Sequence, residues 1–118
     1  MRCEVNKGEK KSPFCCPGED PGNSFEMLLC EATGETHVIS VPLLPFDRPP
    51  VGTGDLTTGL FLVKLLQGAD PRGAFEHTAS AYQAVMQATL DLGEYELQTV
   101  AAQDEIATPT TTFESRPL

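Results

Sequence analysis

The stretch that decides the fold is Val51-Gly52-Thr53-Gly54-Asp55-Leu56-Thr57-Thr58-Gly59-Leu60. It follows a proline-rich loop and opens a run, residues 56–67, in which nearly every position is apolar. Such a run, apolar almost all round, predicts a buried helix. Gly59 in its first turn indicates close backbone packing, and Gly68 is well placed to end the helix.

The start of this predicted helix is a candidate anion site. Gly52 and Gly54 allow backbone conformations that other residues rarely adopt and leave room for a ligand beside the main chain. The N–H groups that open a helix lack intrahelical partners, and the helix dipole adds partial positive charge. An anion can bind there without a basic side chain. Asp55 would stand beside a bound phosphate, where a carboxylate can accept the proton of an attacking hydroxyl.

The same four residues, Gly52 to Asp55, also fit an ordinary loop with an aspartate cap. The pattern lacks the lysine of a P-loop and the third glycine of a dinucleotide-binding fingerprint. Thr57 and Thr58 fit the first helical turn, and one of their hydroxyls could also contact a phosphate.

Two strands are predicted before the proline-rich loop. Residues 25–30 place Phe25, Met27 and Leu29 on one face, and residues 36–41 place His37, Ile39 and Val41 on the face opposite to Val38. Residues 31–35 have the length and the glycine of a hairpin connection. Four prolines within residues 42–50 predict an extended loop.

A second helix carries clear start and stop signals. Asp70 is its predicted N-cap, Pro71 its first helical residue, and Gly93 its stop. A third, shorter helix is predicted over residues 97–107, before an extended tail over residues 110–118. The apolar stripe of the second helix consists of Phe75, Thr78, Tyr82, Val85 and Thr89, flanked by Ala74, Ala79, Met86 and Leu90.

The chain divides at about residue 23. Residues 1–23 lack apolar periodicity and carry clusters of proline, glycine and charge, which predict a poorly ordered segment. Residues 24–118 hold the hairpin and the three helices. Two strands cannot cover a buried helix, so the apolar residues 56–66 imply a larger sheet that this chain does not contain. The sequence therefore predicts an α/β fragment with an incomplete sheet.

Charge and composition exclude some functions. The formal charge is −9, which argues against a nucleic-acid or anionic-membrane surface. Residues 1–11 do not resemble a signal peptide, and the longest apolar stretch, residues 60–66, is too short to span a bilayer. We expect a cytoplasmic protein with no membrane partner.

No metal centre is predicted. The four cysteines lack the paired spacing of a zinc site and are interpreted as reduced thiols: Cys3, Cys15, Cys16 and Cys30. His37 and His77 lack a carboxylate or cysteine constellation along the sequence and are interpreted as surface or packing residues. Lys64 is interpreted as a side chain that reaches from the helix to solvent. The acidic residues Asp91, Glu94 and Glu96 are interpreted as a solvated helix end.

Residues 51–60 resemble the anion-hole motif of ribokinase-like kinases, and the run through Leu65-Leu66-Gln67-Gly68 is similar to bacterial pyridoxal kinases. Three further stretches agree with that family in the same order. They are Phe25-Glu26-Met27-Leu28-Leu29, Phe75-Glu76-His77 and Tyr95-Glu96-Leu97-Gln98 with its continuation Val100-Ala101-Ala102-Gln103-Asp104. The resemblance covers about residues 20–118 and implies the C-terminal part of a three-layer ribokinase-like sandwich.

The resemblance also implies a function. Asp55 would be the base that deprotonates the 5′-hydroxyl of pyridoxal and would contact that substrate. The amides of Gly52, Thr53 and Gly54 would hold the transferred phosphoryl group. The nucleotide would be flanked by Ser40, Val41, Pro42 and Leu43. ATP and Mg²⁺ are the implied cofactors, and a homodimer in vitamin B6 salvage is the implied setting.

Two alternatives stay open. The chain could be a non-catalytic remnant that is stable only as an oligomer or with a complementary N-terminal fragment, because the residues that grip pyridoxal in this family come mainly from a missing N-terminal half. The fold could also serve a hydroxymethylpyrimidine or a sugar. Phe25–Leu29 and Tyr95–Gln98 favour pyridoxal.

Overall fold

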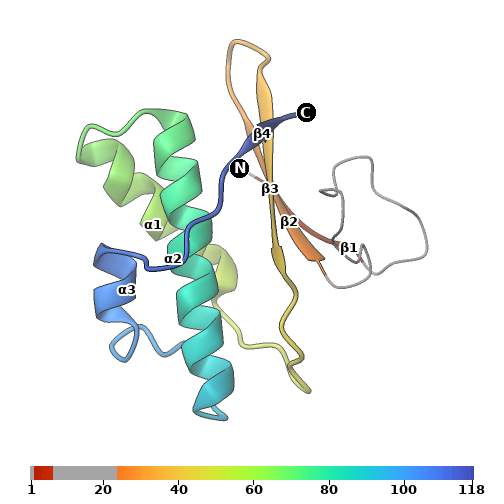
Figure 1. Cartoon of the computed structure of the whole chain (residues 1–118), viewed down its shortest axis with the longest axis vertical. Helices are drawn as coiled ribbons and strands as arrows, with labels where there is room; N and C mark the ends of the chain where they lie inside the picture. The colour runs from red at the N-terminus through yellow and green to blue at the C-terminus, as the bar shows by residue number, and fades with distance from the viewer. Residues whose placement is uncertain (1, 7–23) are drawn as a thin grey trace.

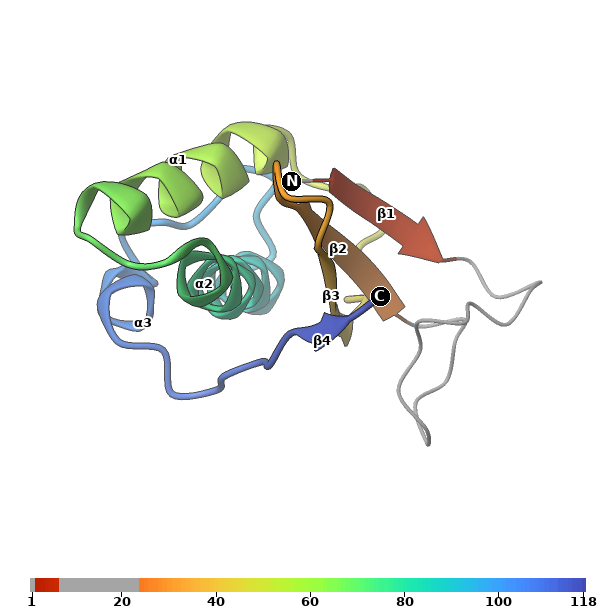
Figure 2. The same ribbon diagram turned by 90° about the horizontal axis from the view of Figure 1, so that it is seen from above.

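The computed structural model describes the backbone of residues 2–6 and the whole of residues 24–118. One antiparallel sheet, in the order β1-β2-β3-β4, has all three helices on one side: α2 packs against the sheet, and α1 and α3 pack against α2 (Figures 1 and 2). The elements are β1 (Arg2–Asn6), β2 (Ser24–Cys30), β3 (Thr36–Pro42), α1 (Thr53–Leu66), α2 (Pro71–Asp91), α3 (Gln103–Ala107) and β4 (Arg116–Pro117).

The predicted hairpin is confirmed. β2 pairs with β3 so that Met27 lies opposite Ile39 and Phe25 opposite Val41. The turn is closed by two bonds of 2.9 Å, one from the Glu31 N–H to the Glu35 carbonyl and one from the Gly34 N–H to the Glu31 carbonyl. Gly34 has a φ of 93°, a backbone conformation that glycine adopts without strain.

The core lies between this hairpin and α2. Because side chains alternate along a strand, one face of β2 and β3 meets the buried stripe of α2. The rings of Phe25 and Tyr82 stack with their centroids 5.5 Å apart. The buried cluster consists of Met27, Leu29, Ile39, Val41, Phe75, Ala79, Tyr82 and Met86.

The predicted boundaries of α2 are confirmed. The Asp70 side chain accepts a hydrogen bond from the Gly73 N–H at 3.2 Å, which satisfies one of the free donors at the helix start. Gly93, with a φ of 67°, follows the helix, and the N–H groups of Gly93 and Glu94 donate to the carbonyls of Leu90 and Thr89. This pair of bonds is the glycine-dependent Schellman ending.

Gly68 ends α1 in the same way, with bonds from Gly68 to Leu65 and from Ala69 to Lys64. The described residues cover this apolar helix only in part, as expected where two predicted strands cannot cover it, and Thr57 is its one buried residue. Leu62, Val63 and Leu66 are 52%, 51% and 78% exposed. The physical reason is the incomplete sheet: the described residues supply one apolar surface for α1, and its outer side has none.

The close packing predicted at Gly59 is wrong, because an added Cβ there would meet no atom within 4 Å. The third helix is shorter than predicted and covers Gln103–Ala107 instead of residues 97–107. Turns precede it, and the Gln98 N–H donates to Thr89 Oγ1 at 3.1 Å, which fixes this segment to α2 before the helix begins.

Two strands were not predicted. β1 corrects the expectation of irregular structure for residues 2–6, and the rest of that prediction, residue 1 and residues 7–23, lies outside the described residues. β4, at the end of the tail, pairs with His37 and Val38 of β3. Both are edge strands that pair through backbone groups, which do not require an apolar alternation in the sequence.

The tail is fixed to α2 by a polar cluster. Arg72 Nε donates to Ser115 Oγ at 2.8 Å, and the Ser115 N–H and hydroxyl donate to Glu76 Oε1 at 3.0 and 2.8 Å. These bonds lead the tail from α3 back to the edge of the sheet. Within the described part of the chain, no helix is long and apolar enough to cross a membrane.

Candidate phosphate-binding site

The start of α1 has the geometry of an anion site. Gly52 is the N-cap residue, with φ 87° and ψ 9°, and no side chain caps this end of the helix. The first intrahelical bond runs from the Leu56 N–H to the Gly52 carbonyl at 3.0 Å. The N–H groups of Thr53, Gly54 and Asp55 therefore have no acceptor within the helix, and they add to the positive end of its dipole.

The two glycines of the motif have different roles. Gly52 is in the left-handed region, and an added Cβ would lie 3.7 Å from Leu97 Cδ1, which is ordinary contact. Its backbone angle is thus the reason for glycine. Gly54 has no positive φ and lies in the helix, so the conformational argument does not hold for it. A Cβ there would meet no atom within 4 Å, so this backbone is open to a ligand.

Asp55 is the third residue of α1 and is exposed. The helix start has no side-chain cap hydrogen bond, so Asp55 does not cap it, and as an acidic residue of the first turn it interacts favourably with the helix dipole. Its carboxylate lies at the edge of an open groove of about 590 Å³ between α1, α2 and α3, which Lys64 and His77 also line. Thr57 and Thr58 are occupied otherwise: their hydroxyls donate to the carbonyls of Thr53 and Gly54 at 2.7 and 2.9 Å.

The groove contains a histidine that resists protonation. Burial lowers the pKa of His77 below its usual value, and the positive charge of Lys64 lowers it further, while a backbone hydrogen bond with Ile106 acts in the opposite direction. His77 is therefore neutral over a wider pH range than a free imidazole.

The residues predicted to flank the nucleotide lie at the end of β3. Val41 is 1% exposed and belongs to the core, so its side chain is not available to a ligand. Ser40 pairs with Glu26 across the sheet. The Pro42 carbonyl accepts a hydrogen bond from Gln83 Nε2 at 3.0 Å.

Pro42 and Leu43 line a second cavity, of about 360 Å³, together with Thr53 at the start of α1. The structure thus brings the loop after β3 and the anion site to one cavity, while Asp55 faces the groove outside it. From the sequence, Tyr82 was assigned to the core alone, and the other side chains that line this cavity were not predicted to line a site. The further lining residues are Phe25, Leu44, Phe46, Pro49, Pro50, Tyr82, Gln83 and Met86.

Comparison with curated proteins finds relatives of one kind. A protein of Pseudomonas fluorescens (strain Pf0-1) named pyridoxal kinase PdxY is 50% identical over 102 residues, which cover 86% of this chain and 34% of the relative. A protein of Proteus mirabilis with the same name is 53% identical over 90 residues, covering 75% of this chain and 31% of the relative. The chain is similar to the C-terminal segment of pyridoxal kinases. It spans about a third of the length of the curated relatives it matches.

Solved structures agree on the fold. Pyridoxal kinase from Trypanosoma brucei superposes with a TM-score of 0.62 at 20% identity, over 80% of this chain and 34% of that chain. The Leishmania donovani pyridoxal kinase in complex with ADP and pyridoxine superposes with a TM-score of 0.64 at 22% identity, over 86% of this chain and 34% of that chain. A Bacteroides thetaiotaomicron protein described as a phosphomethylpyrimidine kinase superposes with a TM-score of 0.69 at 16% identity, over 80% of this chain and 34% of that chain. No family model matches the chain. The predicted fold, the C-terminal part of a ribokinase-like sandwich with an incomplete sheet, is confirmed.

Proposed function

We propose that this chain is the phosphate-binding and catalytic segment of a pyridoxal kinase. The observation that carries the proposal is the start of α1, where three N–H groups without intrahelical acceptors stand beside the exposed carboxylate of Asp55. The 50% sequence identity to a pyridoxal kinase over 102 residues supports pyridoxal as the substrate.

In the proposed reaction, the Asp55 side chain acts as the base and backbone amides bind the phosphoryl group. A carboxylate oxygen of Asp55 accepts the proton of the pyridoxal 5′-hydroxyl as the hydroxyl oxygen attacks the γ-phosphorus of ATP. The bond from that phosphorus to the bridging oxygen of the β-phosphate breaks, and ADP leaves. The amides of Thr53 and Gly54, and by the family resemblance that of Gly52, donate to the oxygens of the transferred group, whose charge the helix dipole also favours.

The nucleotide is proposed to occupy the cavity beside residues 40–43. Its lining is largely apolar and aromatic, which suits a base, and Thr53 connects it to the phosphate end. Val41 would contribute through its backbone, because its side chain is buried. Mg²⁺ would accompany ATP and neutralise phosphate charge during transfer. We expect the assembled kinase to be a homodimer, as the resemblance implies.

The direct test is an assay of pyridoxal phosphorylation with Mg-ATP. The 118-residue chain is assayed alone and after co-expression with the N-terminal part of the Pseudomonas fluorescens relative that the chain does not match. We expect activity in the combined sample that falls by about 100-fold or more in Asp55→Asn, with little change in ATP affinity. Asp91→Asn, at the exposed end of α2, is the matched control. An active Asp55→Asn sample would contradict the assignment of the base.

A second candidate function follows from the exposed side of α1. The residues Leu62, Val63 and Leu66 form an apolar face that, in a whole kinase, the two thirds of the relatives that this chain does not match would cover. The chain would then be a remnant without activity of its own that binds a complementary kinase segment. Binding without turnover in the combined sample would favour this candidate, whereas turnover dependent on Asp55 would favour the first.

A further inference from the structure

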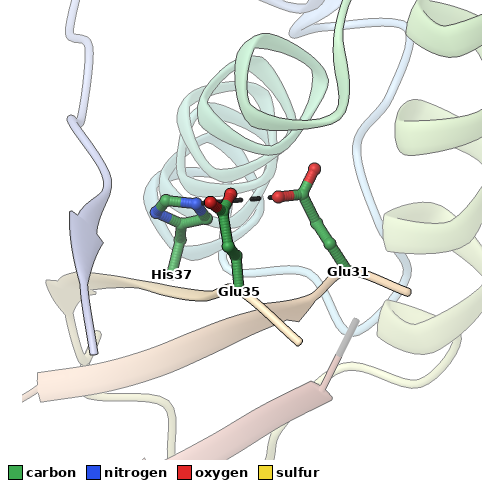
Figure 3. A group of neighbouring side chains, drawn as sticks. All are labelled: Glu31, Glu35 and His37. Atoms are coloured by element: carbon green, nitrogen blue, oxygen red, sulfur yellow. Dashed lines mark ion pairs between the residues drawn. The ribbon is translucent and has the colours of Figure 1, made fainter. Parts of the chain in front are cut away.

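Three metal-ligating side chains meet at the turn between β2 and β3. Figure 3 shows Glu31, Glu35 and His37 pointing toward one another, and one ligand atom from each lies within 4.8 Å of the other two. The sequence showed no such constellation around His37, because Glu31 and Glu35 approach it only when the hairpin closes. The expectation that this histidine lacks carboxylate partners is wrong.

The imidazole of His37 lacks the hydrogen bonds that a buried ring usually makes. The side chain is 12% exposed, and its Nδ1 is buried without a hydrogen-bond partner among the described residues. Its Nε2 lies 3.8 Å from Glu31 Oε2, which is beyond hydrogen-bond range. Nε2 is the ring nitrogen that faces Glu31, so it is the atom positioned to bind an ion together with the two glutamates (Figure 3).

The backbone holds the three residues in place. His37 pairs with Leu29 across the sheet, two positions before Glu31. The bond between the Glu31 N–H and the Glu35 carbonyl, 2.9 Å long, fixes the two glutamates at the two sides of the turn. The cluster therefore depends on the hairpin alone, which the core of the protein stabilises.

We propose that Glu31, Glu35 and His37 bind a divalent first-row transition ion such as Mn²⁺ or Zn²⁺. Two carboxylate oxygens and one imidazole nitrogen are ligands that these ions accept, and water would complete the coordination. Metal–ligand distances of about 2.0–2.2 Å place neighbouring ligand atoms roughly 3.0–3.5 Å apart. The cluster must contract by about an ångström from its present spacing, and Glu35 is exposed and therefore free to move.

The proposed ion would not take part in phosphoryl transfer. The turn lies at the end of the hairpin opposite to the loop that leads from β3 into α1 (Figure 1). Its role would be to join the two strands across their turn, so that bound metal stabilises the folded chain. The proposal is thus independent of the function proposed for the start of α1.

The test uses Mn²⁺ with the full chain, whose two histidines report on location. Mn²⁺ broadens nearby proton resonances, and it competes poorly for the cysteine thiolates that would capture Zn²⁺. We expect the ring signals of His37 to broaden at low Mn²⁺ concentrations while those of His77 stay sharp. Mn²⁺ should also raise the Tm of the chain.

Variants make the test specific. Glu35→Gln keeps the size of an exposed side chain and should weaken Mn²⁺ binding by about tenfold or more, as should Glu31→Gln. Glu94→Gln, an exposed acid far along the chain, should leave binding unchanged. Equal broadening of both histidines, or unchanged binding in Glu35→Gln, would overturn the proposal. Because Glu35 supports no core contact, loss of folding does not obscure the result.

Discussion

Gly52 and Gly54 stand two positions apart in one motif, but the fold requires glycine only at the first. Gly52 has a positive φ at the N-cap of α1, and residues 53–55 then begin the helix with N–H groups that have no acceptor within it. Gly54 is already helical, and the space around it is empty. The pair therefore allows folding and phosphate binding to be separated by mutation.

We predict opposite effects on stability at these two positions. Gly52→Ala should lower the free energy of unfolding by roughly 1 kcal/mol or more, because alanine is strained at this φ. Gly54→Ala should be neutral or slightly stabilising, because alanine favours helix and meets no neighbour. Urea unfolding of the two variants measures both effects. If the proposed function is right, Gly54→Ala should still impair phosphorylation, because its methyl group would stand where the phosphate approaches.

His77 predicts a dependence of stability on pH. Its pKa is lowered by burial and by Lys64, so the folded chain binds a proton less readily than the unfolded chain. The unfolded state thus holds more protons between the lowered pKa and about 6.5, and stability falls as the pH decreases through that window. Above the window both states are neutral and the contribution is zero.

The variant His77→Gln should remove this part of the acid sensitivity. We expect the difference between wild type and His77→Gln in urea midpoint to change when the pH is lowered from 7.5 to 5.5, with wild type losing more stability. The carboxylates are the same in both proteins, so their contribution to the pH dependence of stability cancels in the comparison. An identical pH profile for wild type and His77→Gln would contradict the assignment.

At the scale of elements, α2 offers a prediction about coupled residues. The Asp70 cap bonds the Gly73 N–H, and a Cβ at Gly73 would lie 2.6 Å from Asp70 Oδ1. Asp70→Ala should cost about 1 kcal/mol through loss of the cap. Gly73→Ala should add about 1 kcal/mol of helix propensity in the Asp70→Ala background, but less in wild type, where the methyl group displaces the cap.

A double-mutant cycle on urea unfolding measures this coupling. A gain from Gly73→Ala that is equal in both backgrounds would show that the cap tolerates the methyl group. Asp104→Ala, on the exposed start of α3, provides a background in which the cap of α2 is intact.

The elements that the sequence predicts well carry their signals locally. Asp70 with Pro71 marks a helix start, and Gly68 and Gly93 mark helix ends, because caps depend on neighbouring residues alone. β1 and β4 were missed because edge strands pair through the backbone. The length of α3 was overestimated because Thr89, distant in sequence, bonds Gln98 and holds it in a turn.

In the candidate site too, features set by neighbouring residues could be predicted, and features set by the fold could not. Gly52 to Asp55 could be identified from the sequence because the anion site is a local feature of one helix start. The cavity shared by Leu43 and Thr53 could not be, because only the folded chain brings its lining together, whereas the cluster around His37 lies on the predicted hairpin and was overlooked because its ligands do not follow a familiar metal-site spacing. The buried state of Val41 likewise depends on α2, which the sequence places 30 positions later.

For the molecule as a whole, the decisive feature is a surface that the chain leaves uncovered. The outer side of α1 exposes Leu62, Val63 and Leu66, and the chain spans about a third of its curated relatives. Contiguous apolar patches on a soluble surface mark interfaces or cause aggregation. The same helix carries the candidate phosphate site at its start. A partner that covers the outer side of α1 would therefore lie on the helix that carries this site.

We therefore predict that the isolated chain self-associates and that a polar α1 prevents it. Replacing Leu62, Val63 and Leu66 together by Gln should shift sedimentation at micromolar concentration from oligomers to a compact monomer, because the apolar area that drives association is removed. The matched control replaces Leu92 and Val100, which are also exposed but lie outside α1. If the control dissociates the oligomer equally, association is non-specific. If wild type is already a compact monomer, the uncovered face is not an interface, and the second candidate function loses its main support.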